Sequence, residues 1–191
     1  MTDGRTQGLL PWVAVAAAGA VVCTVCDHLH VVTGVLAYPH VAFWGEAWWV
    51  PLLFGAASVV IVLNAGILRR MFSAPPLAAP SPRRVAAGGV AFVTAYAFTA
   101  YGHELPNVVA AVLAGFWLAR ALQAPAWLVV YSLAVAVGGS AFEATWSALG
   151  FFRYLVPDFA GIPRWLPGIY LHVAFLTADL ERMLRERRAP S

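Results

Sequence analysis

The sequence predicts an all-α membrane protein, with six transmembrane helices in one bundle and both termini in the cytoplasm. The first observation behind this is composition, because 61% of the 191 residues are hydrophobic and 11% are charged. Soluble domains contain about 25% charged residues, and a fold of this size still exposes about 30% of its chain surface to water. The second observation is six long apolar stretches, and the third is the placement of arginine between them. Together they exclude a water-soluble enzyme and a nucleic-acid-binding chain, despite a formal net charge of +3.

A helix that spans a bilayer needs about 20 mostly apolar residues, and six stretches reach or approach that length. The third and fourth stretches are separated by Gly102, His103 and Glu104, which we interpret as a tight solvated turn between antiparallel helices. Pro106 suits the first turn of the fourth helix, where no N–H is needed. The predicted spans are, in order, Leu9–Cys26, Ala47–Leu68, Val85–Tyr101, Leu105–Leu122, Ala126–Leu149 and Pro163–Leu180.

Arginine placement predicts the orientation of the bundle. All 12 basic residues are arginine, and with six spans only Arg153 and Arg164 fall on one side of the membrane. Short arginine-rich loops stay in the cytoplasm, so the side with the other ten is predicted to be cytoplasmic. It includes a basic, proline-rich loop at 69–84 and a basic tail at 181–191. The absence of lysine and the abundance of Ala, Gly, Val and Pro favour a GC-rich bacterial source, and hence the cell membrane.

Cys23, Cys26, Asp27, His28 and His30 could be taken for a metal site. Their spacing does not match a zinc site, which needs well-separated ligand pairs. We interpret the cysteines as core thiols and the following polar residues as the interfacial end of the first span, and we predict neither a metal nor a disulfide framework. The sequence shows no obvious internal repeat and no inverted repeat of hydropathy.

Glu143 is the most informative polar residue, because it lies deep in the fifth span. A carboxyl group near the middle of a bilayer is costly and usually faces the bundle interior or a polar cavity. Three roles stay open: a ligand contact, a proton relay, or a hydrogen bond to a neighbouring helix through Tyr96, Asn64 or His172. Small residues let a helix, a ligand or another protomer approach closely. They occur near Glu143 in the fifth span, at Gly138, Gly139 and Ser140, and again in the third span, at Gly88 and Gly89.

Two motifs carry a more specific signal. One is Ala47-Trp-Trp-Val-Pro51 at the start of the second span, and the other is Pro157-Asp-Phe159 with Arg164-Trp-Leu-Pro167 before the last span. In order and in membrane position these resemble the Insig family, the insulin-induced gene proteins of sterol control. A weaker match, Glu104-Leu-Pro-Asn107, is similar to the family's Asp-Phe-Ala-Asn at the corresponding turn.

The resemblance implies six spans with cytoplasmic ends and an intramembrane pocket for a hydrophobic lipid, which is an oxysterol in the animal proteins. There the lipid-bound form holds the escort protein Scap, or the sterol-synthesis reductase, in the endoplasmic reticulum. The resemblance also implies that Glu104 and Asn107 contact a membrane-protein partner. The chain departs from the family at Leu52, Leu53 and Phe54, which replace Pro-Cys-Cys, and at Glu104, which replaces an aspartate.

The first functional hypothesis is therefore a non-catalytic protein that holds a sterol-like or diacylglycerol-like lipid, needs no cofactor, and signals to a membrane partner. Glu143 would anchor the head of the lipid, and Trp49, Phe92, Tyr96 and Trp146 would form apolar walls. The second hypothesis is a small proton-coupled carrier that uses Glu143 and His172 as relay groups, although the sequence offers no second buried acid. The third is a structural adaptor, packed as a homo-oligomer or against another membrane protein.

Overall fold

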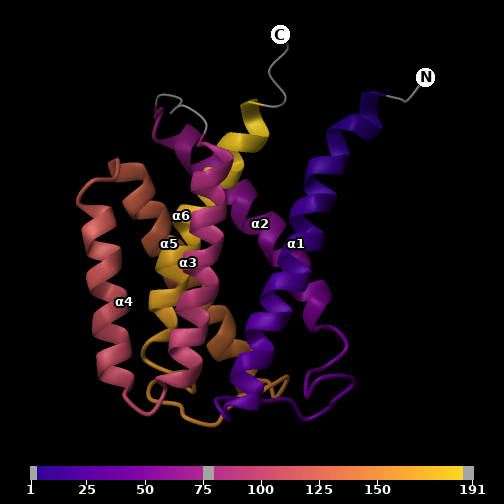
Figure 1. The fold of residues 1–191 in the computed structure, drawn as a ribbon, viewed down its shortest axis with the longest axis vertical. Coiled ribbons are helices and arrows are strands. Elements are labelled where there is room, and N and C mark those ends of the chain that lie inside the picture. Colours follow the sequence, from indigo (N-terminus) through magenta and orange to yellow (C-terminus); the bar gives the residue numbers. More distant parts are fainter. Residues whose placement is uncertain (1–3, 75–79, 187–191) are drawn as a thin grey trace.

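The computed structural model describes residues 4–74 and 80–186, and its helices run side by side along one long axis (Figure 1). Each predicted span overlaps one helix. The helices and strands are α1 (Gly4–Val32), β1 (Leu36–Ala37), α2 (Val50–Met71), α3 (Pro82–Tyr101), α4 (Pro106–Ala121), α5 (Ala126–Ala148), β2 (Arg153–Tyr154) and α6 (Leu166–Glu186).

Helix boundaries follow local chemistry. Pro51 and Pro106 occupy the first turns of α2 and α4, and Ser81 caps α3 by accepting a hydrogen bond from the Arg84 N–H. Helix α1 continues past the predicted end of its span at Cys26, so Asp27 lies within the helix. The predicted loop 69–84 is partly helical, since α2 reaches Met71, and α6 extends through most of the predicted tail. Residues 75–79 and 187–191 lie outside the described residues.

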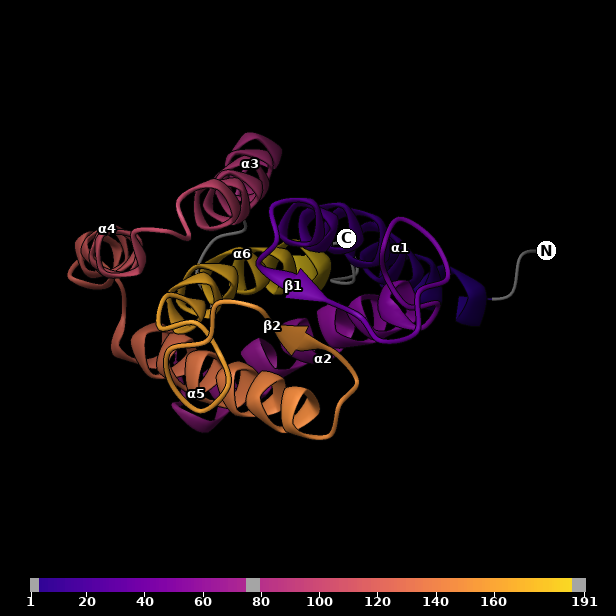
Figure 2. The same ribbon diagram turned by 90° about the horizontal axis from the view of Figure 1, so that it is seen from below.

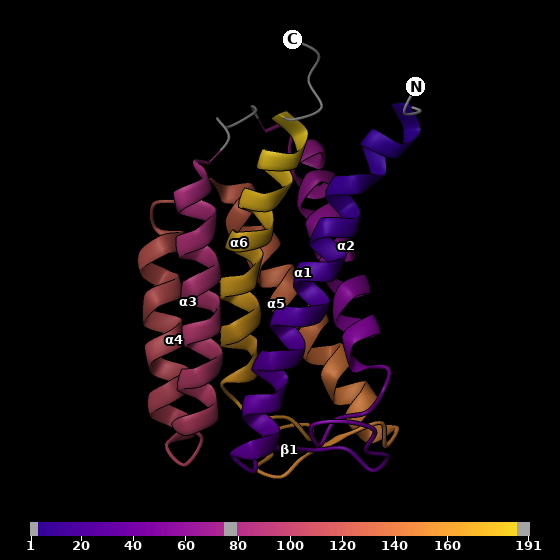
Figure 3. The same ribbon diagram turned by 45° about the vertical axis from the view of Figure 1, so that its right-hand side comes forward.

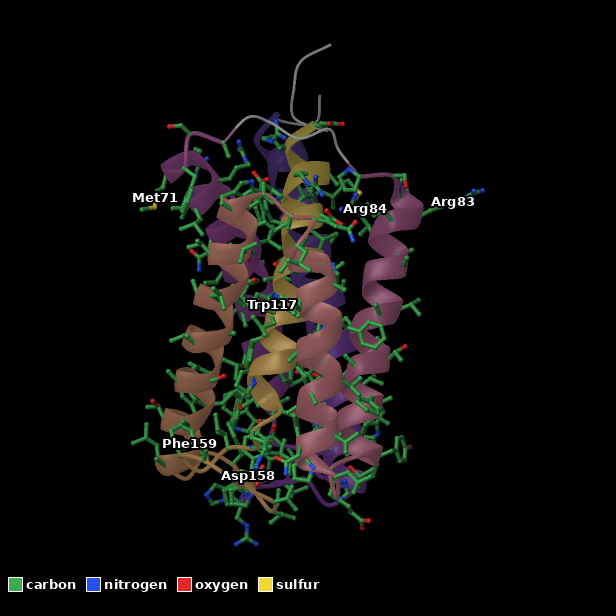
Figure 4. The ribbon with its side chains drawn as sticks, turned by 90° about the vertical axis from the view of Figure 1, so that its left-hand side faces the viewer. Met71, Arg83, Arg84, Trp117, Asp158 and Phe159 are labelled. Atoms are coloured by element: carbon green, nitrogen blue, oxygen red, sulfur yellow. The ribbon has the colours of Figure 1, made fainter. Side chains whose placement is uncertain are left out.

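The two ends of the bundle differ. The start of α1, the end of α6, the end of α2 and the start of α3 lie at one end, while β1, β2 and their loops lie at the other (Figures 1 and 3). Figure 4 shows Arg83 and Arg84 at the first end and Asp158 and Phe159 at the second. We call the first the arginine end and the second the strand end. The largest apolar cluster, around Trp165 and Ile169, lies at the strand end.

Within the described residues, three helices are long and apolar enough to cross a membrane: α1 over Leu9–Val32, α2 and α5. Helix α4 is apolar but shorter. Large apolar side chains point outward from the bundle, such as Leu10, which is 70% exposed, and Val137, which is 72% exposed. Such a surface is suited to lipid tails rather than to water.

Helix α6 is central, because it packs against α2, α3, α4 and α5 (Figure 2). Helices α3 and α4 form a hairpin on one side of the bundle, and α3 also contacts α1. The Nε1 atom of Trp117 on α4 donates a hydrogen bond to Ser132 Oγ on α5 at 3.0 Å, which ties this hairpin to the next helix.

The first and last helical hairpins, α1–β1–α2 and α5–β2–α6, repeat one another, which corrects the expectation of no internal repeat. Their turns share one backbone conformation: φ is 48° at Trp44 and 49° at Ala160, and 77° at both Gly45 and Gly161. Matching residues are separated by 116 positions, for example 154 minus 38. They pair Asp27 with Glu143, Gly34 with Gly150, Tyr38 with Tyr154, Phe43 with Phe159, Gly45 with Gly161, Trp49 with Trp165, and Pro51 with Pro167.

The pairing of β1 with β2 gives this repeat a local two-fold axis. Ala37 lies opposite Arg153, its own counterpart, and Leu36 lies opposite Tyr154, the counterpart of Tyr38. Viewed from the strand end, the strand pair lies between α1 and α5 (Figure 2). Because α1 and α5 run in the same direction (Figure 1), the axis runs along the bundle, and the repeat is parallel rather than inverted.

Candidate functional site

A cavity of about 630 Å³ lies between the two repeated hairpins. Its volume is within the range of about 300–1,000 Å³ that small-molecule sites occupy. The wall is mostly apolar and comes from α1, α2, α3, α5 and α6, with Tyr38 and Phe152 from the strand-end loops. Val60 and Ile67 of α2 line it and are also 53% and 46% exposed on the outside of the bundle. The cavity therefore opens sideways, where lipid would surround the protein.

Glu143 lines this cavity from α5. Its Oε1 atom accepts a hydrogen bond from the Tyr170 hydroxyl at 2.8 Å, and its Oε2 atom accepts one from the Tyr154 hydroxyl at 3.3 Å. The predicted hydrogen bond to a neighbouring helix is present, but its partner is Tyr170 of α6 rather than Tyr96, Asn64 or His172. His172 instead contacts the Leu113 carbonyl through Nε2 at 3.0 Å.

Gly139 makes room for the tyrosine that holds Glu143. A Cβ atom built on Gly139 would lie 2.4 Å from ring carbons of Tyr170, which is closer than non-bonded carbon atoms can approach. At the adjacent Gly138, an added Cβ atom would meet nothing within 4 Å. The small-residue pair on α5 thus has two different roles, since Gly139 accommodates an aromatic ring and Gly138 leaves the cavity wall open.

Three of the four predicted wall residues line the cavity, namely Trp49, Phe92 and Tyr96. Trp146 is not among the lining residues and instead packs behind the wall. Its ring lies 5.3 Å from that of Trp49 and 4.5 Å from that of Phe151, measured between centroids. It supports the position of Trp49, so ligand contact by these residues stays a prediction for Trp49, Phe92 and Tyr96.

Asp27 is a second acid in the cavity, which corrects the expectation that Glu143 is the sole buried acid. Its Oδ2 atom accepts a hydrogen bond from the Tyr38 hydroxyl at 2.6 Å. Asp27 follows the predicted end of the first span at Cys26, so its sequence position alone indicates an interfacial residue. The signal that could have found it is the 116-residue spacing to Glu143.

The two tyrosines that hold these acids stay protonated. Burial raises the pKa of Tyr38, and the charges of Asp27 and Glu143 raise it further. Burial also raises the pKa of Tyr154, and both acids again add to the effect. Each phenol is therefore fixed as a hydrogen-bond donor, and both acids lie within electrostatic range of both tyrosines.

His28 and His30, which lie on α1 beyond the predicted end of the first span, have structural partners. His30 Nε2 contacts Thr99 Oγ1 at 2.9 Å, and its ring stacks on Trp165 with centroids 5.3 Å apart. His28 Nδ1 contacts the Trp44 carbonyl at 2.8 Å. Among the described residues, no group of three or more His, Cys, Asp or Glu side chains could hold a metal ion.

The residues predicted to contact a partner lie outside the cavity, at the strand end. Glu104 and Asn107 are exposed at the α3–α4 turn. Asn107 Oδ1 accepts a hydrogen bond from Arg164 at 2.6 Å, and Arg164 also pairs with Asp158 at 2.9 Å. Hydrogen bonds from Arg164 hold the pKa of Asp158 below its usual value. The α3–α4 turn and the loop before α6 therefore form one exposed polar surface.

Comparison with known proteins gives a consistent result. No sequence profile of a known family matches the chain. The chain is 32% identical over 189 residues to the INSIG protein homolog of Mycolicibacterium vanbaalenii, and the match covers 89% of this chain and 84% of the relative.

Two crystal structures have a similar fold. One is the mycobacterial Insig homolog MvINS from Mycobacterium vanbaalenii, with a TM-score of 0.80 and 25% identity. The other is a cross-linked trimer of MvINS, with a TM-score of 0.80 and 26% identity. In each case the alignment covers 96% of this chain and 98% of the other.

Proposed function

The chain belongs to the Insig family of integral membrane proteins, and on that basis we propose that it binds a neutral membrane lipid without catalysing a reaction. The lipid occupies the cavity between the repeated hairpins, with its polar head at Glu143 and its apolar body along α2, α5 and α6. A sterol-like or diacylglycerol-like molecule has this form. No cofactor is needed, because binding acts by favouring one packing of the bundle that a membrane partner recognises.

The observation that carries this proposal is a cavity of about 630 Å³ whose wall is mostly apolar and includes the Glu143 carboxyl. The half-buried carboxyl of Glu143, already held by Tyr154 and Tyr170, keeps further capacity for hydrogen bonds. A charged head would have to leave water for this apolar site at high cost, so a neutral hydroxyl head is favoured. The sideways opening at Val60 and Ile67 gives a lipid a path from the bilayer.

Lipid identification tests the proposal. The protein is extracted gently, and lipids that remain after detergent washing are quantified by mass spectrometry. We expect about one neutral lipid per chain, and at least a tenfold loss of retention in Glu143→Leu, because the hydrogen bonds to the head are lost. The matched control is Thr145→Leu, two residues further along α5, where the side chain is exposed and lines no part of the cavity.

A cavity-filling variant separates cavity lipid from lipid on the outer surface. Ala57→Trp would place a large ring inside the cavity and should expel the bound molecule. If the wild-type protein retains no neutral lipid, or if Glu143→Leu and Ala57→Trp retain as much as Thr145→Leu, the cavity is not a lipid site.

A proton-coupled carrier is the second candidate, and the specific observation in its favour is Asp27, which supplies the second buried acid. The pair first expected as relay groups, Glu143 and His172, makes separate contacts, and His172 does not line the cavity. Substrate flux into proteoliposomes that follows an imposed pH gradient and stops in Asp27→Asn would favour the carrier over the lipid-binding protein.

Assembly and location complete the proposal. The cross-linked trimer of MvINS supports a homo-oligomer for this chain as well. A role as a structural adaptor would instead need a different membrane protein at the Glu104–Asn107 surface, and cross-linking in native membranes distinguishes the two. We place the six helices across the cell membrane, with the arginine end in the cytoplasm.

A further inference from the structure

Asp27 occupies in the first half of the repeat the place that Glu143 occupies in the second. Each acid lies on the first helix of its hairpin and lines the same cavity. Each accepts a hydrogen bond from a tyrosine 11 residues further along the chain, at 2.6 Å from Tyr38 to Asp27 and at 3.3 Å from Tyr154 to Glu143. Tyr154 belongs to β2, and Tyr38 directly follows β1, so both tyrosines lie at the strand pair. The acids are therefore related by the local two-fold axis.

The two half-sites differ in one contact. Tyr170 gives Glu143 its second hydrogen bond, and the counterpart of Tyr170 at a spacing of 116 is Phe54, which lines the cavity but has no hydroxyl. The room for Tyr170 comes from Gly139, and the counterpart of Gly139 is Cys23. The half-site at Asp27 thus replaces a glycine and a tyrosine by a cysteine and a phenylalanine. This leaves Asp27 with greater capacity to accept a hydrogen bond from a ligand.

Both acids act on one small region of the cavity. The charges of Asp27 and Glu143 both raise the pKa of Tyr38 and of Tyr154. The tyrosines stay protonated and donate a hydrogen bond to their acids. Each carboxyl group therefore keeps capacity to accept a further hydrogen bond from the cavity. A buried polar group whose hydrogen bonds are incomplete is costly in an apolar site. A ligand with a single hydroxyl would complete one half-site and leave the other incomplete.

We propose that Asp27 and Tyr38 form a second polar anchor equivalent to Glu143 and Tyr154, and that the cavity binds a neutral lipid whose head carries two hydroxyl groups. One hydroxyl donates to each acid, and the apolar body lies along α2, α5 and α6. This inference rests on the proposed function, because it requires that the cavity holds a lipid. It adds Asp27 as a binding residue and a diol head as the preferred ligand class.

The test compares two lipids that differ in one hydroxyl group. Octadecylglycerol has two free hydroxyls, and its 2-O-methyl ether has one. Each competes for delipidated full-length protein in detergent, and bound lipid is read by native mass spectrometry. We expect the wild-type protein to bind the diol about tenfold more tightly than the ether. Asp27→Asn should abolish this preference while the ether still binds.

A matched control is available on the same helix. Thr24 is buried, lies outside the cavity lining, and its Oγ1 atom has no hydrogen-bond partner among the described residues. Thr24→Val therefore removes a buried polar group from α1 without touching either anchor, and the preference for the diol should stay about tenfold. Glu143→Gln should lower the preference as Asp27→Asn does, because each acid is expected to accept one of the two hydroxyls.

The outcomes separate this inference from the proposed function. If the wild-type protein binds neither lipid, the cavity is not a lipid site and both proposals fail. If both lipids bind equally well, or if Asp27→Asn keeps the tenfold preference, a lipid site remains and the second anchor is excluded. If Asp27→Asn fails to fold, Tyr38→Phe takes its place in the test. Loss of the diol preference in Tyr38→Phe would support the second anchor, and an unchanged preference would exclude it.

Discussion

Glu46 shows at the scale of one residue how far the structure departs from the ordinary rules of burial. It is fully buried in the loop before α2, and neither carboxyl oxygen has a hydrogen-bond partner among the described residues. Its backbone closes the tight turn with Phe43, and its counterpart in the second hairpin is the apolar residue Ile162. Burial at this apolar position of the repeat disfavours the charged form of the carboxyl, so it raises the pKa of Glu46 to about 7.

This shift predicts a pH dependence of stability. A carboxyl whose pKa is raised in the folded state, here from 4.5 to about 7, stabilises the fold when protonated, below its unfolded pKa. That contribution is lost as the pH rises through 7. We expect wild-type protein to be more stable at pH 5 than at pH 8, relative to Glu46→Gln, by on the order of 2 kcal/mol after allowance for screening. Thermal unfolding of both proteins in detergent measures the difference, and equal pH profiles would contradict it.

At the scale of elements, apolar length and prolines were enough to place all six helices, because each long apolar stretch is bounded by glycine, proline or polar residues. The end of α1 was not predictable from its own residues. The sequence indicates that Asp27 and His30 are interfacial. Their hydrogen-bond partners Tyr38 and Thr99 come from other elements, and both side chains are buried on α1. Strands β1 and β2, of two residues each, are too short to leave a pattern.

The candidate site was predictable only in part for the same reason. Glu143 is conspicuous because an acid interrupts an apolar span, and three of its predicted wall neighbours line the cavity. Its hydrogen-bond partners depend on helix rotation and on the local two-fold axis, which local sequence does not specify. The repeat itself preserves the positions that set the turns and anchors, such as Gly45 and Gly161, while the helices between them have diverged.

Helix α5 offers a matched pair of substitutions at adjacent glycines. Gly139→Ala would force the Tyr170 ring away from α5 and weaken its hydrogen bond to Glu143. We expect a loss of about 1–3 kcal/mol in stability, as for other overpacked sites, together with weaker lipid retention. Gly138→Ala meets nothing within 4 Å and should be neutral or stabilising by up to about 1 kcal/mol, because alanine favours the helix. Thermal unfolding compares them, and equal effects would show that Tyr170 does not depend on the space at Gly139.

At the scale of the whole molecule, charge is separated along the bundle. The arginine end holds Arg69, Arg84 and Arg182, and the last two pair with Asp179, so several guanidinium groups are anchored close to the expected membrane surface. Arg69 likewise pairs with Glu181 at 3.6 Å. The strand end holds Arg153 and Arg164. Because both described chain ends lie at the arginine end (Figure 1), one orientation fixes the location of both termini.

This asymmetry predicts which end faces the cytoplasm. Met71 and Phe159 are labelled at opposite ends in Figure 4, and they are 74% and 75% exposed, so cysteines there should be equally reactive. In a background with Cys23→Ala and Cys26→Ala, a membrane-impermeant maleimide added to intact cells should label Phe159→Cys. It should label Met71→Cys only after the cells are broken, because arginine-rich ends are retained in the cytoplasm. The reverse pattern would invert the bundle and place the strand end on the cytoplasmic side.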